Sequence, residues 1–136
     1  MTMTAQFNFL RVRNGICYFA RVAVSADVGS TGVRISDAVD EGEWTNEPWR
    51  AAALVGAGNA LARHLDAGGE QSALLVTAIL GTDVDTTPNS VEVAAFGAAW
   101  IALGHPESQL DISFGDKWTV SSKPDVSPSV TKNGDT

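Results

Sequence analysis

Residues 79–96 read ILGTDVDTTPNSVEVAAF and join the two elements on which the predicted fold depends. Ahead of this stretch, the apolar run from Leu74 to Leu80 predicts a central β-strand that helices cover on at least one side. The alanine-rich run that follows predicts a helix over 89–103, slim enough to lie beside another helix on one sheet. The chain therefore passes from a buried strand, through a polar loop, into a second buried element.

The polar loop itself is a candidate binding site. If the strand continued through Asp83 and Asp85, their carboxylates would lie on one face, about 7 Å apart. Together with oxygens of Thr86 or Thr87 they would suit Mg²⁺ or Ca²⁺. The favoured interpretation is simpler: a strand turning into a helix, with Thr87 as its cap and Pro88 in its first turn. No metal or cofactor is therefore predicted, and the four polar residues are kept as candidate binding residues.

The first 24 residues predict a β-hairpin. Asn14-Gly15 readily takes the positive φ angles of a two-residue type I′ turn, which would pair Arg13 with Ile16. The residues that would then share the core face are Phe7, Phe9, Tyr18, Ala20, Val22 and Val24. A short third strand is predicted over 33–35, and the acidic stretch 37–44 is predicted to be a loop.

A first helix is predicted over 46–66, with Asn46 as its cap and the glycines after Asp66 as its end. Its predicted buried stripe consists of Leu54, Gly58, Leu61 and Leu65, flanked by Val55 and Ala57. Gly56 and Gly58 lie inside this helix, where each costs about 1 kcal/mol relative to alanine. We therefore expect these glycines to pack closely against another element.

The second helix has Asn89 and Glu92 at capping-box spacing, and Gly104 with Pro106 ends it. After it, apolar residues alternate on one parity and predict a last strand or hairpin. These residues are Leu110, Ile112, Phe114 and Trp118.

The element order predicts a single α+β domain over 1–120, in which an antiparallel-rich sheet carries two helices on one face. Residues 121–136 have the composition of a disordered tail.

Composition limits the classes of function. Nine basic residues face sixteen acidic ones, a net charge of −7, which disfavours nucleic-acid binding. No apolar run is long enough for a membrane helix, so no membrane association is predicted. The single cysteine, Cys17, forms no internal disulfide, which favours a cytoplasmic location.

His64 and His105 are both predicted to be surface residues rather than catalytic bases, and no nucleophile or zinc motif is present. Trp44, beside the acidic loop, is predicted to be exposed and to anchor a partner protein, whereas Trp100 is predicted to lie in the core.

From about residue 15 to residue 103 the chain resembles domain IV of translation elongation factor G. The matching stretches are GICYFARVAVSADVGSTGVRISDAV (15–39), EPWRAAALVGAGNALARHL (47–65), ALLVTAILGTDVDTT (73–87) and VEVAAFGAAWIAL (91–103). The resemblance implies a split β-α-β sandwich, similar to the ribosomal-protein-five domain-2-like fold, with a left-handed crossover. That superfamily holds RNA binders and enzymes alike, so its fold does not define a function.

The chain also departs from that family. The loop over 81–87 lacks the histidine that is characteristic of the family's tip loop, and its negative charge would be repelled by ribosomal RNA. The sequence has no P-loop pattern, so this chain by itself is not expected to be a translocase. We expect a non-enzymatic domain that binds a protein partner or forms a homo-oligomer. Two alternatives stay open: a small enzyme or metal-binding protein that uses Asp83, Asp85 and Thr87, and a ribosome- or RNA-associated accessory protein.

Overall fold

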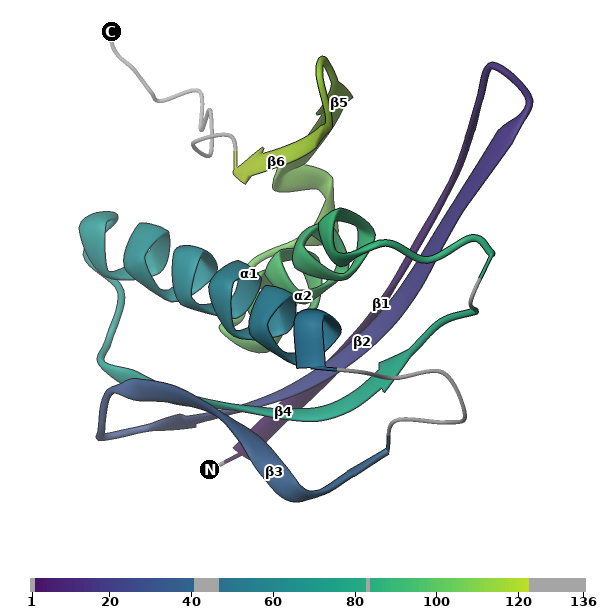
Figure 1. Ribbon diagram of the computed structural model, residues 1–136. Coiled ribbons are helices and arrows are strands. Elements are labelled where there is room, and N and C mark those ends of the chain that lie inside the picture. Colours follow the sequence, from purple (N-terminus) through teal and green to yellow (C-terminus); the bar gives the residue numbers. More distant parts are fainter. Residues whose placement is uncertain (1, 41–46, 83, 123–136) are drawn as a thin grey trace, which may run out of the picture.

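The computed structural model describes residues 2–40, 47–82 and 84–122, with only the backbone described for 37–40 (Figure 1). Along the chain the elements are β1 (Thr2–Arg13), β2 (Ile16–Val28), β3 (Gly32–Asp40), α1 (Glu47–Asp66), β4 (Ser72–Leu80), α2 (Pro88–Ala102), a short 3-10 turn (Glu107–Gln109), β5 (Leu110–Phe114) and β6 (Trp118–Ser122). This order confirms the predicted α+β class.

The main sheet has the strand order β1-β2-β4-β3, so β2 and β4 are central. β1 pairs with β2 and β2 pairs with β4 in antiparallel fashion, whereas β3 runs parallel to β4. Both helices lie on the same side of this sheet, with α2 over β1 and β2 and α1 over β3 and β4 (Figure 1). The antiparallel-rich sheet with helices on one face is therefore confirmed.

The N-terminal hairpin has the predicted register. Asn14 and Gly15 both have positive φ angles, 52° and 78°, and Arg13 pairs with Ile16. All the predicted core residues of this hairpin are buried except Tyr18, which is half-buried. Local turn chemistry thus fixes the register of two long strands.

A β-bulge in β4 keeps one face of that strand toward the helices. Val24 pairs with Val76 and Ala23 with Ala78, which leaves Thr77 as an extra residue in β4. Because side chains alternate along a strand, the extra residue moves Ile79 onto the same core face as Val76. Ile79 and Val76 are both fully buried.

The third strand is longer than predicted. β3 runs from Gly32 to Asp40, so the prediction of a loop is wrong for 37–40. Pairing with β4 extends the strand, since Asp40 lies opposite Ala78. The rest of the predicted acidic loop, the predicted cap Asn46 and the candidate anchor Trp44 lie outside the described residues.

The buried face of α1 differs from the predicted stripe. Leu61 is buried as predicted, but Leu54, Gly58 and Leu65 are only partly buried and Val55 is half exposed. The buried residues of α1 are Trp49, Ala52, Ala53, Gly56, Ala57, Ala60, Leu61 and His64. The reason is the partner: close packing against α2 selects small side chains at the contact, and Leu54 and Val55 lie on the more exposed side of the helix.

The two helices come closest at Gly56. A Cβ atom at this position would lie 2.1 Å from the carbonyl oxygen of Glu92 in α2, which no side chain tolerates. The facing residues of α2 include Ala95, which lies 3.1 Å from the same position. The expected close packing is therefore confirmed for Gly56 and wrong for Gly58, which has nothing within 4 Å.

Thr87 caps α2, with Pro88 as the first helical residue, as the simpler interpretation of the loop predicted. The Thr87 hydroxyl accepts a hydrogen bond from the backbone N–H of Ser90 at 3.1 Å. The predicted capping box of Asn89 is wrong. Its side-chain amide instead donates to the carbonyl of Trp118 and accepts from the Trp118 N–H, both at 2.8 Å, and so attaches β6 to the first turn of α2.

β5 and β6 form the predicted C-terminal hairpin, which packs on β1 and β2 through an aromatic cluster. Trp118 meets Phe9 edge-on with ring centroids 5.3 Å apart, and meets Tyr18 at 5.5 Å. Phe114 lies 5.0 Å from Trp118. At the end of β6, the Arg63 guanidinium donates to the Ser122 side chain and carbonyl. Ordered pairing therefore reaches Ser122, and residues 123–136 lie outside the described part of the chain.

We expect Gly56→Ala to destabilise the protein by about 1–3 kcal/mol, because the added methyl group forces α1 away from the Glu92 carbonyl. Gly58→Ala is the matched control, since the same change in an open position of the same helix stabilises by about 0.5–1 kcal/mol. Urea unfolding followed by circular dichroism measures both. Equal effects of the two substitutions would show that the close helix contact is not a constraint.

Candidate functional site

The loop over 81–87 is held by its own hydroxyl groups. Thr86 is buried, and its hydroxyl donates to the carbonyl of Phe19 in β2 at 2.6 Å while accepting from the N–H of Thr82 at 2.9 Å. The Thr82 hydroxyl accepts from the Asp85 N–H at 2.9 Å. These bonds anchor the loop on β2 and close it on itself.

Backbone pairing continues past the end of β4. The Phe19 N–H donates to the Asp85 carbonyl at 2.9 Å, so the loop adds to the edge of β2 beyond Leu80. Of the predicted binding residues, Asp83 and Trp44 lie outside the described residues, and Thr86 and Thr87 use their hydroxyls to shape the loop and cap α2. No cluster of three or more histidine, cysteine or acidic residues suited to a metal ion occurs in the described ranges. The binding role of this loop stays a prediction.

We expect Thr86→Val to lower the free energy of unfolding by about 1–3 kcal/mol, because it leaves the partly buried Phe19 carbonyl and the Thr82 N–H without this partner. Thr86→Ser, which keeps the hydroxyl, is the control and should recover most of that loss. Chemical denaturation measures both variants. If Thr86→Val is as stable as Thr86→Ser, the hydroxyl does not hold the loop.

His64 and His105 form a hydrogen-bonded pair in which His64 is buried and His105 is partly buried. His64 is only 7% exposed, so its prediction as a surface residue is wrong. Its Nδ1 lies 2.8 Å from Nε2 of His105, and its Nε2 lies 3.0 Å from the carbonyl oxygen of Glu70. The Glu70 carbonyl can only accept, so His64 carries its proton on Nε2 and accepts at Nδ1 from the Nε2–H of His105.

The surroundings of this pair explain the burial of His64. The ring of His105 stacks on Trp100 with centroids 3.8 Å apart. Gly69, in the turn after α1, lies so close to the His64 ring that a Cβ atom there would be 2.2 Å away. The pair ties the end of α1 to the turn after α2, and both ring nitrogens of His64 have hydrogen-bond partners inside the protein. It is therefore a structural contact between the ends of the two helices.

Burial, and after it the neighbouring His64, lowers the pKa of His105 from its ordinary value of 6.5. The unfolded chain therefore takes up this proton at a higher pH than the folded protein does. The resulting contribution to stability is complete above pH 6.5 and is lost as the pH falls from there toward the folded-state pKa.

We expect the Tm of the wild-type protein to fall between about pH 7.5 and pH 5.5 more steeply than that of His105→Gln. Glutamine keeps an N–H donor at this position but cannot be protonated. Thermal unfolding across this pH range measures both slopes. Because the two proteins carry the same carboxylates, the difference between their slopes reports the contribution of His105. Parallel slopes would contradict a lowered pKa of His105 in the folded protein.

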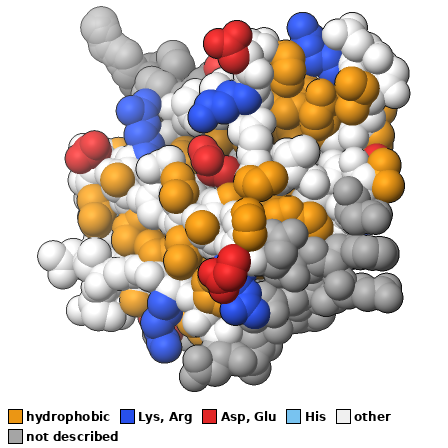
Figure 2. Space-filling view, viewed as in Figure 1, with side chains coloured by type: hydrophobic (Ala, Val, Ile, Leu, Met, Phe, Trp, Pro, Cys, Tyr) orange, Lys and Arg blue, Asp and Glu red, His pale blue; other side chains and the backbone are white. Residues whose placement is uncertain are grey.

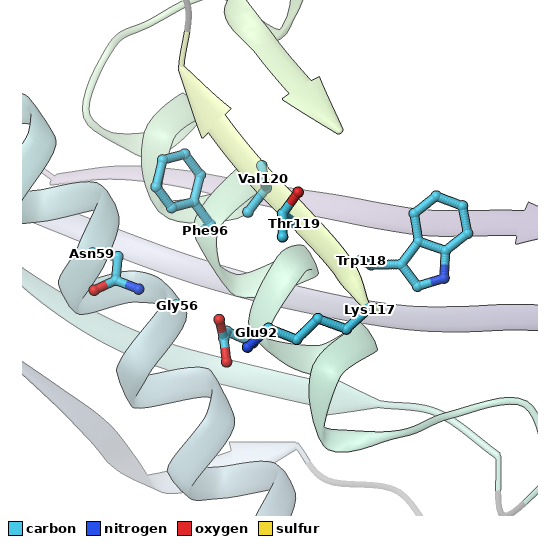
Figure 3. A pocket seen from close by; sticks show the side chains of 8 residues that line it. All are labelled: Gly56, Asn59, Glu92, Phe96, Lys117, Trp118, Thr119 and Val120. Carbon is cyan, nitrogen blue, oxygen red and sulfur yellow. The ribbon is translucent and has the colours of Figure 1, made fainter. Parts of the chain in front are cut away.

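A small cleft lies between α1, α2 and β6 (Figure 3). Its lining residues are Gly56, Asn59, Glu92, Phe96, Lys117, Trp118, Thr119 and Val120. The Lys117 and Glu92 side chains extend toward each other across it, whereas the Trp118 indole points away from the other labelled side chains (Figure 3). Its volume of about 150 Å³ is well below the roughly 300–1,000 Å³ of sites for organic ligands. This cleft therefore offers little room for a substrate.

The projecting end of the β1–β2 hairpin, residues 10–19, is the most exposed apolar part of the sheet; we call it the arm. It extends past the helices, and hydrophobic side chains gather over it (Figures 1 and 2). Leu10, Val12 and Ile16 are 55%, 71% and 55% exposed. Cross-strand pairing places Leu10 opposite Phe19 and Val12 opposite Cys17, so these four residues form an apolar strip on the face that no described helix covers.

Charge is distributed unevenly along the chain. Residues 1–26 contain three arginines and no acidic residue, whereas the remaining residues hold six basic and sixteen acidic side chains. Residues 1–26 thus carry a net charge of +3, and residues 27–136 carry −10. Arg13 is held over the Phe114 ring, 4.5 Å from its centroid, and Arg11 lies 5.4 Å from the Phe9 ring. The arm itself thus carries two arginines and no acidic residue.

Comparison with known proteins shows the fold and little more. No protein-family model and no curated protein matches the chain. Among solved structures, a protein of Thermus thermophilus is similar with a TM-score of 0.56 and 15% sequence identity. The likeness covers 74% of this chain but only 15% of that longer chain. It shows a shared fold, found there as a small part of a larger protein. No described helix has the length and apolar character that crossing a bilayer requires.

Proposed function

We propose that this protein is a non-catalytic interaction module that binds a partner protein through the apolar strip of the arm. The observation that carries the proposal is the exposure of Leu10 and Val12 beside Phe19 and Cys17, on a hairpin that projects beyond the helices. Monomeric proteins rarely leave contiguous apolar surface of this kind in water unless it serves binding. Covering these side chains with a partner supplies the driving force for association.

The resemblance to domain IV of elongation factor G supports an interaction role. The resemblance implies this element order, and a Thermus thermophilus protein carries a similar fold as one part of a longer chain. In that family the domain acts by inserting one end into a large assembly. The equivalent end of this chain carries apolar residues and acidic loop residues rather than a histidine, which favours a protein surface over ribosomal RNA. A free Cys17 thiol within the strip fits a reducing compartment such as the cytoplasm.

The alternatives gain less support from the geometry. A metal-binding or catalytic loop needs free oxygen ligands, and the hydroxyls of Thr82, Thr86 and Thr87 already bond within the protein. A ribosome-associated role would depend on the positive charge of the arm alone. Co-sedimentation with ribosomes at low salt is the direct test of that alternative. If the protein still binds ribosomes after Arg11 and Arg13 are replaced by uncharged residues, the charge of the arm does not explain the binding.

We expect the double variant Leu10→Ser/Val12→Ser to lose its partner while keeping the fold. Both side chains are exposed, so the Tm should change little, whereas binding should weaken about tenfold to a hundredfold because two apolar contacts are lost. Quantitative affinity capture from cells that naturally express the protein measures the loss. Val28→Ser/Val55→Ser, at exposed positions elsewhere, is the matched control. Identical captured sets for the two double variants would contradict the proposal.

A further inference from the structure

We infer that the outer edge of β1 is a docking site for an extended, acidic segment of a partner protein, which pairs with β1 as a fifth strand of the main sheet. This inference rests on the proposed interaction role and says how the partner would bind. It uses the backbone edge of β1, whereas the proposal above uses the apolar side chains of the arm.

The turn geometry determines which backbone groups face this edge. A two-residue type I′ turn makes its flanking residues, Arg13 and Ile16, a hydrogen-bonded pair. Hydrogen-bonded and non-hydrogen-bonded pairs then alternate along an antiparallel ladder. Even-numbered residues of β1 therefore point both N–H and C=O away from β2. These residues are Thr2, Thr4, Gln6, Asn8, Leu10 and Val12.

These outward groups are available to a further strand. Within the described ranges β1 pairs with β2 alone, so its other side is an edge of the sheet. One contact confirms the direction: the Leu10 carbonyl accepts a hydrogen bond from Nη1 of Arg11 at 2.9 Å. A guanidinium thus covers one acceptor of the edge, and an incoming strand would displace it.

β1 lacks the features that usually protect sheet edges. Natural edges are short, bulged, or interrupted by proline or lysine. β1 is twelve residues long, contains neither residue type, and keeps an unbroken register from Thr2 to Arg13. The opposite edge, β3, has an irregular register between Ile35 and Asp40. Of the two edges, β1 is the one built to accept another strand.

Charge indicates the chemistry of the occupant. Arg11 and Arg13 lie on the face of β1 that carries the aromatic cluster. Arg21 lies on the other face, where its Nε donates to the Asn8 side chain at 2.6 Å. A strand added beside β1 would pass guanidinium groups on both of its faces, which suits alternating carboxylates. A second copy of β1 is also cationic and has no acidic residue to offer, so the charges favour a different, acidic segment.

The test uses a fluorescein-labelled, amidated peptide of ten residues that alternates glutamate with valine and threonine. We expect the wild-type protein to bind it, with affinity falling as salt rises, and to ignore the same peptide with lysine in place of glutamate. Gln6→Pro removes one outward N–H and places a ring at the edge, so it should weaken binding about tenfold or more. Gln6→Thr keeps the N–H and should bind like the wild type.

Amide hydrogen exchange tests the same site without a substitution, in case Gln6→Pro fails to fold. In the free protein, the amides of Thr4, Gln6 and Asn8 should exchange quickly and those of Phe7 and Phe9 slowly. Saturating peptide should slow the first group selectively. No binding by the wild type, equal binding of the glutamate and lysine peptides, or no protection of even-numbered amides would overturn the inference.

Two further results separate this site from its neighbours. A wild-type dimer in sedimentation equilibrium that Gln6→Pro makes monomeric would overturn the inference, since a second copy would then occupy the edge. The Leu10→Ser/Val12→Ser variant should still bind the peptide, because its backbone edge is intact. If that variant loses its cellular partner while the wild type binds no peptide, the interaction role stands and the edge site is wrong.

Discussion

The approach of Gly56 to the Glu92 carbonyl sets how closely α1 and α2 pack on the sheet. Because α1 and α2 meet through glycine and alanine, the helix pair is narrow and covers only part of a sheet whose first hairpin is much longer. The uncovered length of that hairpin becomes the arm. The same α2 presents Asn89 at its first turn, which attaches β6 through the Trp118 backbone and completes the aromatic cluster over β1 and β2.

The parts of the fold that local chemistry determines could be predicted from the sequence. Asn14-Gly15 fixes a turn type and hence the pairing of every residue of the first hairpin, and Thr87-Pro88 marks the start of α2. The face of α1 could not be predicted in this way. Leucines dominate any apolar pattern, but the contact with α2 excludes large side chains and rotates the helix so that Leu54 lies partly outside.

Long-range contacts account for the rest of what was missed. The residues around His64 in the sequence do not indicate that it is buried, because its partner His105 is 41 residues away. The hydrogen bond between the two rings forms only when the folded chain brings the ends of the two helices together. Thr86 likewise bonds to a carbonyl 67 residues earlier, so its hydroxyl could be taken for an ion ligand. The position of the loop between β4 and α2 could thus be predicted from the sequence. The hydrogen-bond partners of its side chains could not, because they depend on tertiary structure.

Residues 1–26 carry three arginines and no acidic residue, so most of the first hairpin presents positive charge on an otherwise acidic protein. Fields of this kind act over about a Debye length, roughly 8–10 Å at physiological ionic strength, before any contact forms. A charged molecule that diffuses toward this protein is therefore turned so that its negative side meets the first hairpin. Salt then governs how often encounters are productive, whereas hydrogen bonds and apolar contacts govern how long a complex lasts.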